Sequence, residues 1–146
     1  MDDRIRSLAH TLWRYHQLDH ELAPADAIMV LCSHDVAVAE RGIDPQKFIL
    51  VQKPYMERRT YATFKQRWPE KDIAVTSPRA SFDDYLNGYT NKALSSDDVI
   101  AIMVGDLQRI RVYAERGWQI PQEIPADVWQ AYEQLVAAGY DKYLTS

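Results

Sequence analysis

The amino-acid sequence predicts an α/β fold with a short parallel sheet and two C-terminal helices. Three short apolar runs lack the polar alternation of a half-exposed strand, which is typical of parallel strands buried on both faces. They alternate with segments whose apolar residues recur every three or four positions, as in amphipathic helices. The 146 residues suit a single domain, residues 1–146, with one core of ordinary size.

The first half of the chain contains signals for two helices and three strands. Residues 3–18 have apolar side chains at helical spacing and predict an amphipathic helix. Strands are expected at residues 27–32, 48–51 and 73–75. Residues 54–68 predict a helix between the last two strands, with Pro54 at an N-terminal position where no backbone N–H is needed. Such a strand–helix–strand unit belongs to a parallel sheet that helices cover on both sides.

The connection between the first two predicted strands is short. Residues 33–47 join them, close to the minimum of about a dozen residues that a parallel crossover needs. Residues 35–41 have room for two helical turns, with Gly42 as a left-handed C-cap. The alternative is that these two strands are not neighbours in the sheet.

The last third of the chain is predicted to be helical. Ser95 and Asp98 have the spacing of a capping box, and the apolar stripe that follows them continues to Gly117. A second helix follows Pro125 and ends at Gly139. Before these helices, residues 81–94 are polar and predict an ordered linker or, alternatively, a lid.

Composition excludes several functional classes. The five glycines lie too far apart for a G-x-G-x-x-G turn or a G-x-x-x-x-G-K-[ST] phosphate loop. The single cysteine, Cys32, cannot form an internal disulfide or a cysteine-built zinc site. The acidic N-terminus and short apolar runs predict neither a signal peptide nor a membrane span, so we expect a cytoplasmic protein. The net charge of −4 argues against nucleic-acid binding.

Polar residues follow each predicted strand, and open α/β sheets bind ligands beyond the carboxyl ends of their strands. The candidate ligand-binding residues are Ser33, His34, Asp35, Gln52, Lys53, Arg58, Arg59, Thr76 and Ser77. The two arginines stand in a first helical turn, where each opposes the macrodipole by about 0.3–1 kcal/mol. A bound anion would make the two arginines favourable at this position, since guanidinium and helix N–H groups both suit phosphate. The alternative is that Glu57 pairs with one arginine and both cover the sheet edge.

Other chemistry is less well supported by the residues. Ser33, His34 and Asp35 are consecutive, and consecutive side chains cannot converge as a catalytic triad. We interpret Asp35 as a helix N-cap or a ligand contact. His16 and His20 lie one helical turn apart, but without a third ligand we expect a solvated helix face rather than a metal site. No metal and no catalytic residue is assigned.

In residues 51–64, which read V-Q-K-P-Y-M-E-R-R-T-Y-A-T-F, the chain closely resembles the V-Q-x-P-x-M-x-R-R-x-x-A-T-F signature of YdcF-like proteins. These belong to the SanA/ElyC/YdcF family, whose function is unknown. Residues 25–31 resemble the family's opening strand, and residues 120–129 resemble the tail of its closer YdcF-like members. The resemblance implies a Rossmann-like α/β sandwich with its ligand pocket over the strand ends. It implies S-adenosylmethionine or another nucleotide-like molecule as the ligand, with the reaction undefined.

The chain departs from the family near residues 39–42. Between the opening strand and the R-R segment, family members carry a strand with a G-G-x-G-like turn, an acidic residue and an S-T-N-T-x-x-N-like segment, which line the pocket. None of these is present here. We interpret the difference as an internal deletion that leaves a reduced sandwich and an incomplete cofactor site. Loss of a strand should expose an edge or an apolar face that a second copy of the chain covers in a homodimer.

The sequence thus predicts a YdcF-type domain that binds a small anionic or nucleotide-like ligand. The alternative is an interaction or assembly module, or an inactive remnant of the family, in which the arginines form surface ion pairs. Neither a nucleic acid nor a membrane is expected as a partner.

Overall fold

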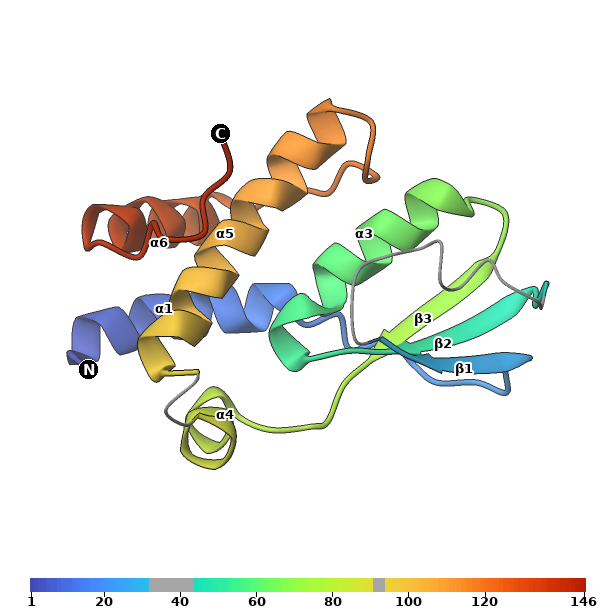
Figure 1. The fold of residues 1–146 in the computed structure, drawn as a ribbon, viewed down its shortest axis with the longest axis horizontal. Coiled ribbons are helices and arrows are strands. Elements are labelled where there is room, and N and C mark those ends of the chain that lie inside the picture. The colour runs from blue at the N-terminus through green and yellow to red at the C-terminus, as the bar shows by residue number, and fades with distance from the viewer. Residues whose placement is uncertain (32–43, 91–93) are drawn as a thin grey trace.

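The computed structural model describes residues 1–31, 44–90 and 94–146. Its helices are α1 (Asp3–His16), α3 (Glu57–Arg67), α4 (Phe82–Tyr89), α5 (Ser96–Glu115) and α6 (Ala126–Ala137), with the 3-10 helix η1 (Pro54–Met56) (Figure 1). Its strands are β1 (Ala27–Val30), β2 (Lys47–Val51) and β3 (Asp72–Thr76). The predicted α/β class, with a short parallel sheet and two C-terminal helices, is confirmed.

The strands form one parallel sheet in the order β1-β2-β3. β1 and β2 are hydrogen-bonded neighbours, so the alternative in which they are separated is wrong. The helix expected at residues 35–41 and its cap Gly42 lie outside the described residues.

One face of the sheet is covered by α3. Phe48 and Leu50 of β2 and Ile73 and Val75 of β3 are buried on this face, where they pack around Phe64 of α3. They alternate with less buried neighbours, as the two-residue period of a strand requires. This small core holds α3 against the sheet, so that the N-terminus of α3 lies at the carboxyl edge of β2.

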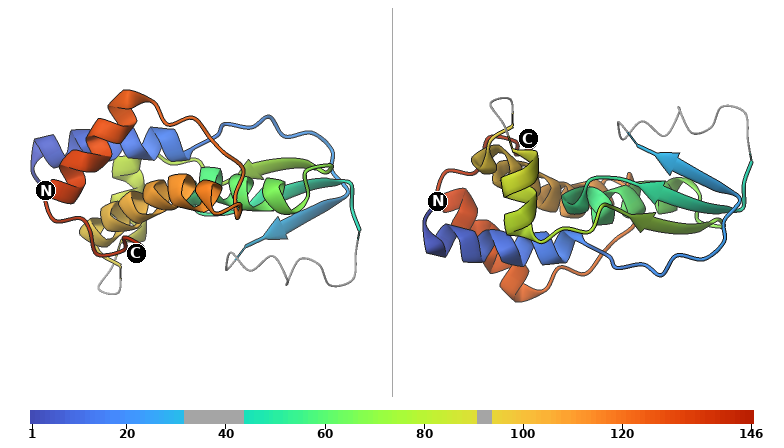
Figure 2. Two further views of the ribbon diagram at one scale, coloured as in Figure 1. Left: turned by 90° about the horizontal axis from the view of Figure 1, so that it is seen from above. Right: turned by 90° about the horizontal axis from the view of Figure 1, so that it is seen from below.

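The opposite face of the sheet is open in the described part of the chain. Ile28 and Val30 of β1 are 67% and 73% exposed on it. The strand register places Ile49 and Val51 of β2 beside them. No described helix packs on this side, so the expected cover on both sides is not found there (Figure 2). We refer to Ile28, Val30, Ile49 and Val51 as the open face.

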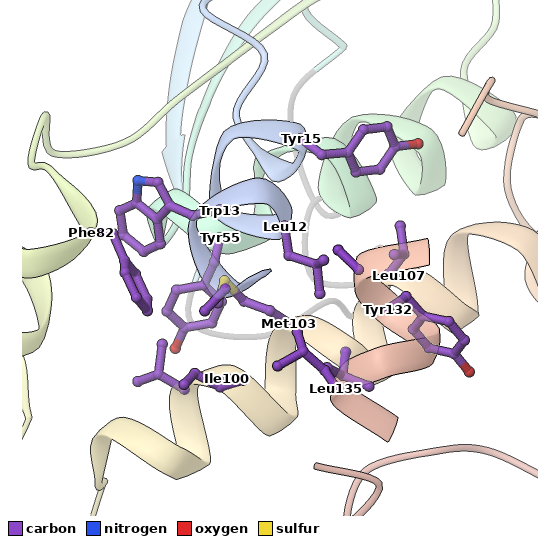
Figure 3. Packing of buried hydrophobic residues seen from close by; sticks show 14 of the residues in the cluster. Leu12, Trp13, Tyr15, Tyr55, Phe82, Ile100, Met103, Leu107, Tyr132 and Leu135 are labelled. Atoms are coloured by element: carbon purple, nitrogen blue, oxygen red, sulfur yellow. The ribbon is translucent and has the colours of Figure 1, made fainter. Parts of the chain in front are cut away.

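A second, larger core lies beyond the carboxyl ends of the strands, among α1, α4, α5 and α6 (Figure 2). Figure 3 shows Leu12 and Trp13 of α1 beside Ile100 and Met103 of α5 and Leu135 of α6. Apart from Trp13, these residues belong to the apolar stripes that the helical spacing predicts. The helical layer places the residues that follow α1 and three residues of α4, namely Asp84, Tyr85 and Tyr89, in the pockets at the sheet edge where ligands are expected.

The ends of α5 and α6 follow local capping rules. The Ser95 side chain accepts the N–H of Asp98, and the Asp98 carboxylate accepts the N–H of Ser95, which confirms the predicted capping box. The helices end close to Gly117 and Gly139, as predicted, and these glycines have φ angles of 72° and 96°, the left-handed conformation that favours glycine. None of the helices in the described ranges combines the length and the apolar character that crossing a membrane requires.

The segment predicted as a linker contains helix α4. Ser81 caps this helix by accepting the N–H of Asp84, and the Ser81 hydroxyl also donates to the Asp84 carboxylate. The linker prediction is wrong here because a serine and an aspartate three residues apart start a helix, as they do at Ser95 and Asp98.

Candidate functional site

An apolar pocket of about 490 Å³ opens at the carboxyl edge of the sheet. Its walls come from the ends of β1 and β2, from η1, from the turn after β3 and from α4. The lining residues include Val30, Val51, Gln52, Lys53, Tyr85 and Tyr89. We call it the edge pocket. It lies where open parallel sheets bind their ligands.

Gln52 follows β2 directly and is 7% exposed. Its backbone N–H extends the sheet by donating to the carbonyl of Thr76, and its side-chain Oε1 accepts the N–H of Lys53. Its Nε2 has no hydrogen-bond partner among the described residues. A buried donor that loses its partner costs about 1–3 kcal/mol. Gln52 is therefore a buried polar residue in the lining of an apolar pocket, with a side-chain donor that no described residue accepts.

Tyr85 and Tyr89 form one wall of the edge pocket, one turn apart on α4. Their rings stack with centroids 4.8 Å apart and an interplanar angle of 14°. Tyr85 is held against Trp13, whereas Tyr89 is 54% exposed. Lys53 is exposed in the lining and has no ion-pair partner in the ranges that the structure describes. An aromatic wall, an amide donor and a cation together suit a planar ring that carries an acceptor and a negative charge.

A second pocket, of about 380 Å³, borders the same turn after β3. Its lining includes Asp19 and His20 after α1, Glu57 in α3, Ser77 and Arg79 in the turn, and Asp84 in α4. Because three carboxylates line it, we call it the acidic pocket. Asp19 has a φ of 50°, a left-handed conformation that aspartate tolerates better than most residues.

Arg58 lies against α1 and lines neither pocket. Its Nε donates to the carbonyl of Tyr15, and its guanidinium stands 4.2 Å from the centroid of the Tyr15 ring. Its Nη1 donates to Oε1 of Gln122 at 3.2 Å. Tyr15 belongs to the last turn of α1, whose free carbonyls carry the negative end of the helix dipole. The negative partner of Arg58 is thus a helix terminus of the same chain.

Arg59 forms a buried ion pair with α5. Its Nη1 donates to Oδ1 of Asp106 at 2.6 Å, and Asp106 is 2% exposed. Nη1 of Arg109 lies 3.8 Å from the same oxygen. Burial raises the pKa of Asp106, against the lowering that Arg59 and Arg109 cause. A carboxylate of the protein therefore occupies the position at Arg59 where the sequence predicts a bound anion.

The structure divides the predicted site residues into separate groups. Gln52 and Lys53 meet at the edge pocket, whereas Thr76 and Ser77 line the acidic pocket. Arg58 and Arg59 lie between helices. The remaining candidates, Ser33, His34 and Asp35, lie outside the described residues.

Tyr85 and Tyr89 belong to the edge pocket but are missing from the sequence prediction. They are missed because the segment that contains them is predicted as a linker. Their spacing of four residues, four residues after the cap Ser81, is the signal that identifies them as one face of a helix.

His16 and His20 do not form the beginning of a metal site. His16 is fully buried, its Nε2 donates to the carbonyl of Met103 at 2.9 Å, and burial lowers its pKa to about 4. His20 accepts the N–H of Val75 through Nδ1. The prediction of a solvated helix face is wrong for His16. No group of metal-ligating side chains occurs among the residues that the structure describes.

The chain is similar to an uncharacterized protein of Streptomyces coelicolor, with 37% identity over 103 residues. The matched part covers 70% of this chain, and the chain spans 45% of the length of that relative. No protein-family model and no solved structure matches the chain. Membership of the YdcF-like family stays a prediction that rests on the motif in residues 51–64.

Proposed function

We propose that the chain is a YdcF-like domain that binds a small nucleotide-like ligand in the edge pocket. The observation that carries this proposal is the buried Gln52 side chain, whose Nε2 has no partner among the described residues. A nucleobase offers ring nitrogens and carbonyl oxygens that accept such a donor. S-adenosylmethionine, which the family resemblance implies, carries a base of this kind. No reaction is assigned, and a cytoplasmic location is part of the same proposal.

The other features of the edge pocket agree with this ligand class. The stacked rings of Tyr85 and Tyr89 provide a surface for a planar base. Lys53 provides a positive charge for an anionic group such as a phosphate. The two arginines of the motif have protein partners, so the anion-binding role passes in this proposal to Lys53.

Replacing Gln52 with leucine should remove the affinity for the base and leave the fold intact. Leucine keeps an apolar volume of similar size but has no donor, and it removes a buried amide that is unsatisfied in the free chain. We expect the affinity for adenosine to fall at least tenfold, which is about 1.4 kcal/mol. Isothermal titration calorimetry with adenosine, AMP, S-adenosylmethionine and inorganic phosphate measures this loss.

Two further variants make the titration specific. Gln130→Leu on the exposed side of α6 is the matched control and should bind like the wild type. Lys53→Ala should weaken AMP and spare adenosine, which separates the charge from the base. The proposal is contradicted if none of the four ligands binds the wild type, or if Gln52→Leu binds adenosine as the wild type does.

A second candidate function is assembly through the open face. Ile28 and Val30 are large apolar side chains that are mostly exposed, beside Ile49 and Val51 of the next strand. Both faces of a parallel sheet are normally covered. Contiguous exposed apolar residues mark interaction surfaces. These observations support a second copy of the chain as the partner.

The paired replacement of Ile28 and Val30 with threonine should convert a dimer into a monomer. Threonine keeps the β-branched shape that suits a strand but places a hydroxyl on the face that must be desolvated. Size-exclusion chromatography with light scattering over a range of concentrations measures the mass. Leu22→Thr, at an exposed leucine outside the sheet, is the control. A wild-type chain that is monomeric at every concentration rules assembly out.

A further inference from the structure

Glu57 is a buried carboxylate that forms no direct ion pair with any of the described residues. It begins α3, is 6% exposed and lines the acidic pocket. Its Oε2 accepts the backbone N–H of Leu18 at 2.8 Å, and its Oε1 accepts the hydroxyl of Ser77 at 2.6 Å. Both donors are neutral. The adjacent Arg58 donates to Tyr15 instead and interacts with Glu57 only electrostatically, so the direct pairing of Glu57 with an arginine, which the sequence left open as an alternative, is not formed.

The contacts of Glu57 do not neutralise its charge. Buried charges in proteins are normally paired with an opposite charge, because removing them from water is costly. The N-terminus of α3 and the two hydrogen bonds stabilise the carboxylate, but neither supplies an opposite unit charge. Each carboxylate oxygen keeps further acceptor capacity after its one bond. Glu57 therefore presents negative charge and free lone pairs at the wall of a cavity.

The other groups around the acidic pocket do not supply the missing cation. Asp19 and Asp84 are carboxylates themselves. Nδ1 of His20 accepts the N–H of Val75 at 3.1 Å, which leaves its ring proton on Nε2, and burial lowers the pKa of His20, so the ring is neutral near pH 7. Arg79 is the single cation among the lining residues, and it is exposed, with no ion-pair partner in the described ranges.

We propose that the acidic pocket is a second binding site, which takes the ammonium group of a small amine with Glu57 as its counter-ion. The ammonium donates to the carboxylate of Glu57 and to the oxygen of Ser77, whose own proton is directed at Glu57. Asp19 and Asp84 add negative potential that attracts the cation. The cavity of about 380 Å³ has the volume for an amino acid or a short diamine.

An amino acid and a short diamine both carry an ammonium group, but they should differ in their contacts with Arg79 and with the other two carboxylates of the pocket. An amino acid places its carboxylate on Arg79, which binds carboxylates through its guanidinium fork. A diamine places its second ammonium beside Asp19 or Asp84 instead. The affinities of glycine and 1,4-diaminobutane, each compared with that of methylammonium, show which source the pocket prefers.

The test is an NMR titration of the isotope-labelled full chain with methylammonium, glycine and 1,4-diaminobutane at constant ionic strength. We expect saturable shifts at the amides of Leu18, Ser77 and their neighbours. Glu57→Gln should weaken binding at least tenfold, because glutamine keeps the size of the side chain but not its charge. Glu70→Gln, at an exposed carboxylate in the turn after α3, removes the same charge and should bind like the wild type.

Three results overturn the proposal: no saturable shift with any of the three amines, shifts located away from the acidic pocket, or equal affinity in Glu57→Gln. If Glu57→Gln does not fold, the location and saturation of the wild-type shifts decide alone. A purely structural role of Glu57 would lower the stability of Glu57→Gln while the wild type binds no amine.

The amine site is independent of the nucleotide-like ligand in the edge pocket. Gln52→Leu should leave amine binding unchanged, and Glu57→Gln should leave adenosine binding unchanged. Failure of one proposal is therefore distinguishable from failure of the other.

Discussion

Replacing Arg59 with methionine should lower the free energy of unfolding by about 3–5 kcal/mol, the usual cost of removing one partner of a buried ion pair. Asp106, at 2% exposure, would lose its partner at 2.6 Å and keep only Arg109, 3.8 Å away. Methionine fills much of the space of the arginine stem, so the loss reports on charge rather than on a cavity. Urea unfolding at pH 7, followed by circular dichroism, measures the change.

The control is Arg6→Met, which removes an exposed ion pair with Asp83 and should cost at most about 1 kcal/mol. The double replacement of Arg59 with methionine and Asp106 with leucine should recover part of the stability, because the buried carboxylate is gone, whereas Arg109, which is 20% exposed, then loses its partner. A loss in Arg59→Met no larger than that in Arg6→Met would show that the buried pair does not stabilise the fold.

The partners of the two arginines show where sequence reasoning stops. Arg58 and Arg59 are unusual residues for the first turn of a helix, and the sequence correctly singles them out as needing negative partners. Those partners are Tyr15 and Asp106, which lie 43 and 47 residues away along the chain. Which helix packs against α3 depends on the tertiary core and not on local spacing. The sequence therefore predicts the need for negative charge and not its source.

Most features with local signals were predicted correctly, and the start of α4 at Ser81 is the exception. The three strands follow from apolar runs, and the capping box at Ser95 follows from side chains three residues apart. The edge pocket was predicted in part. Gln52 and Lys53 could be predicted as site residues because they directly follow a strand. Tyr85 and Tyr89 could not, because the polar composition of residues 81–94 obscured the helix on which they lie. The hydrogen bond from Ser77 to Glu57 joins two segments that no spacing rule relates.

The buried His16 should make the stability of the chain fall as the pH is lowered from 6.5 to 4. Burial lowers the pKa of His16 from 6.5 to about 4, so between these values the unfolded chain binds a proton that the folded chain does not. The contribution of His16 to the free energy of unfolding is therefore fully present above pH 6.5. By linkage, the free energy of unfolding should be lower by about 2 kcal/mol at pH 5 and by about 3 kcal/mol at pH 4. Urea unfolding at half-unit intervals of pH measures this slope.

His16→Gln is the variant that isolates the effect, since the glutamine amide can still donate to the carbonyl of Met103 but does not titrate. Its stability should change less between pH 6.5 and 5, where acidic side chains with ordinary pKa values contribute little. His20, whose pKa burial also lowers, accounts for a smaller remaining slope. Equal slopes in the wild type and His16→Gln would show that His16 is protonated in the folded chain, and the donor to Met103 would then belong to an imidazolium.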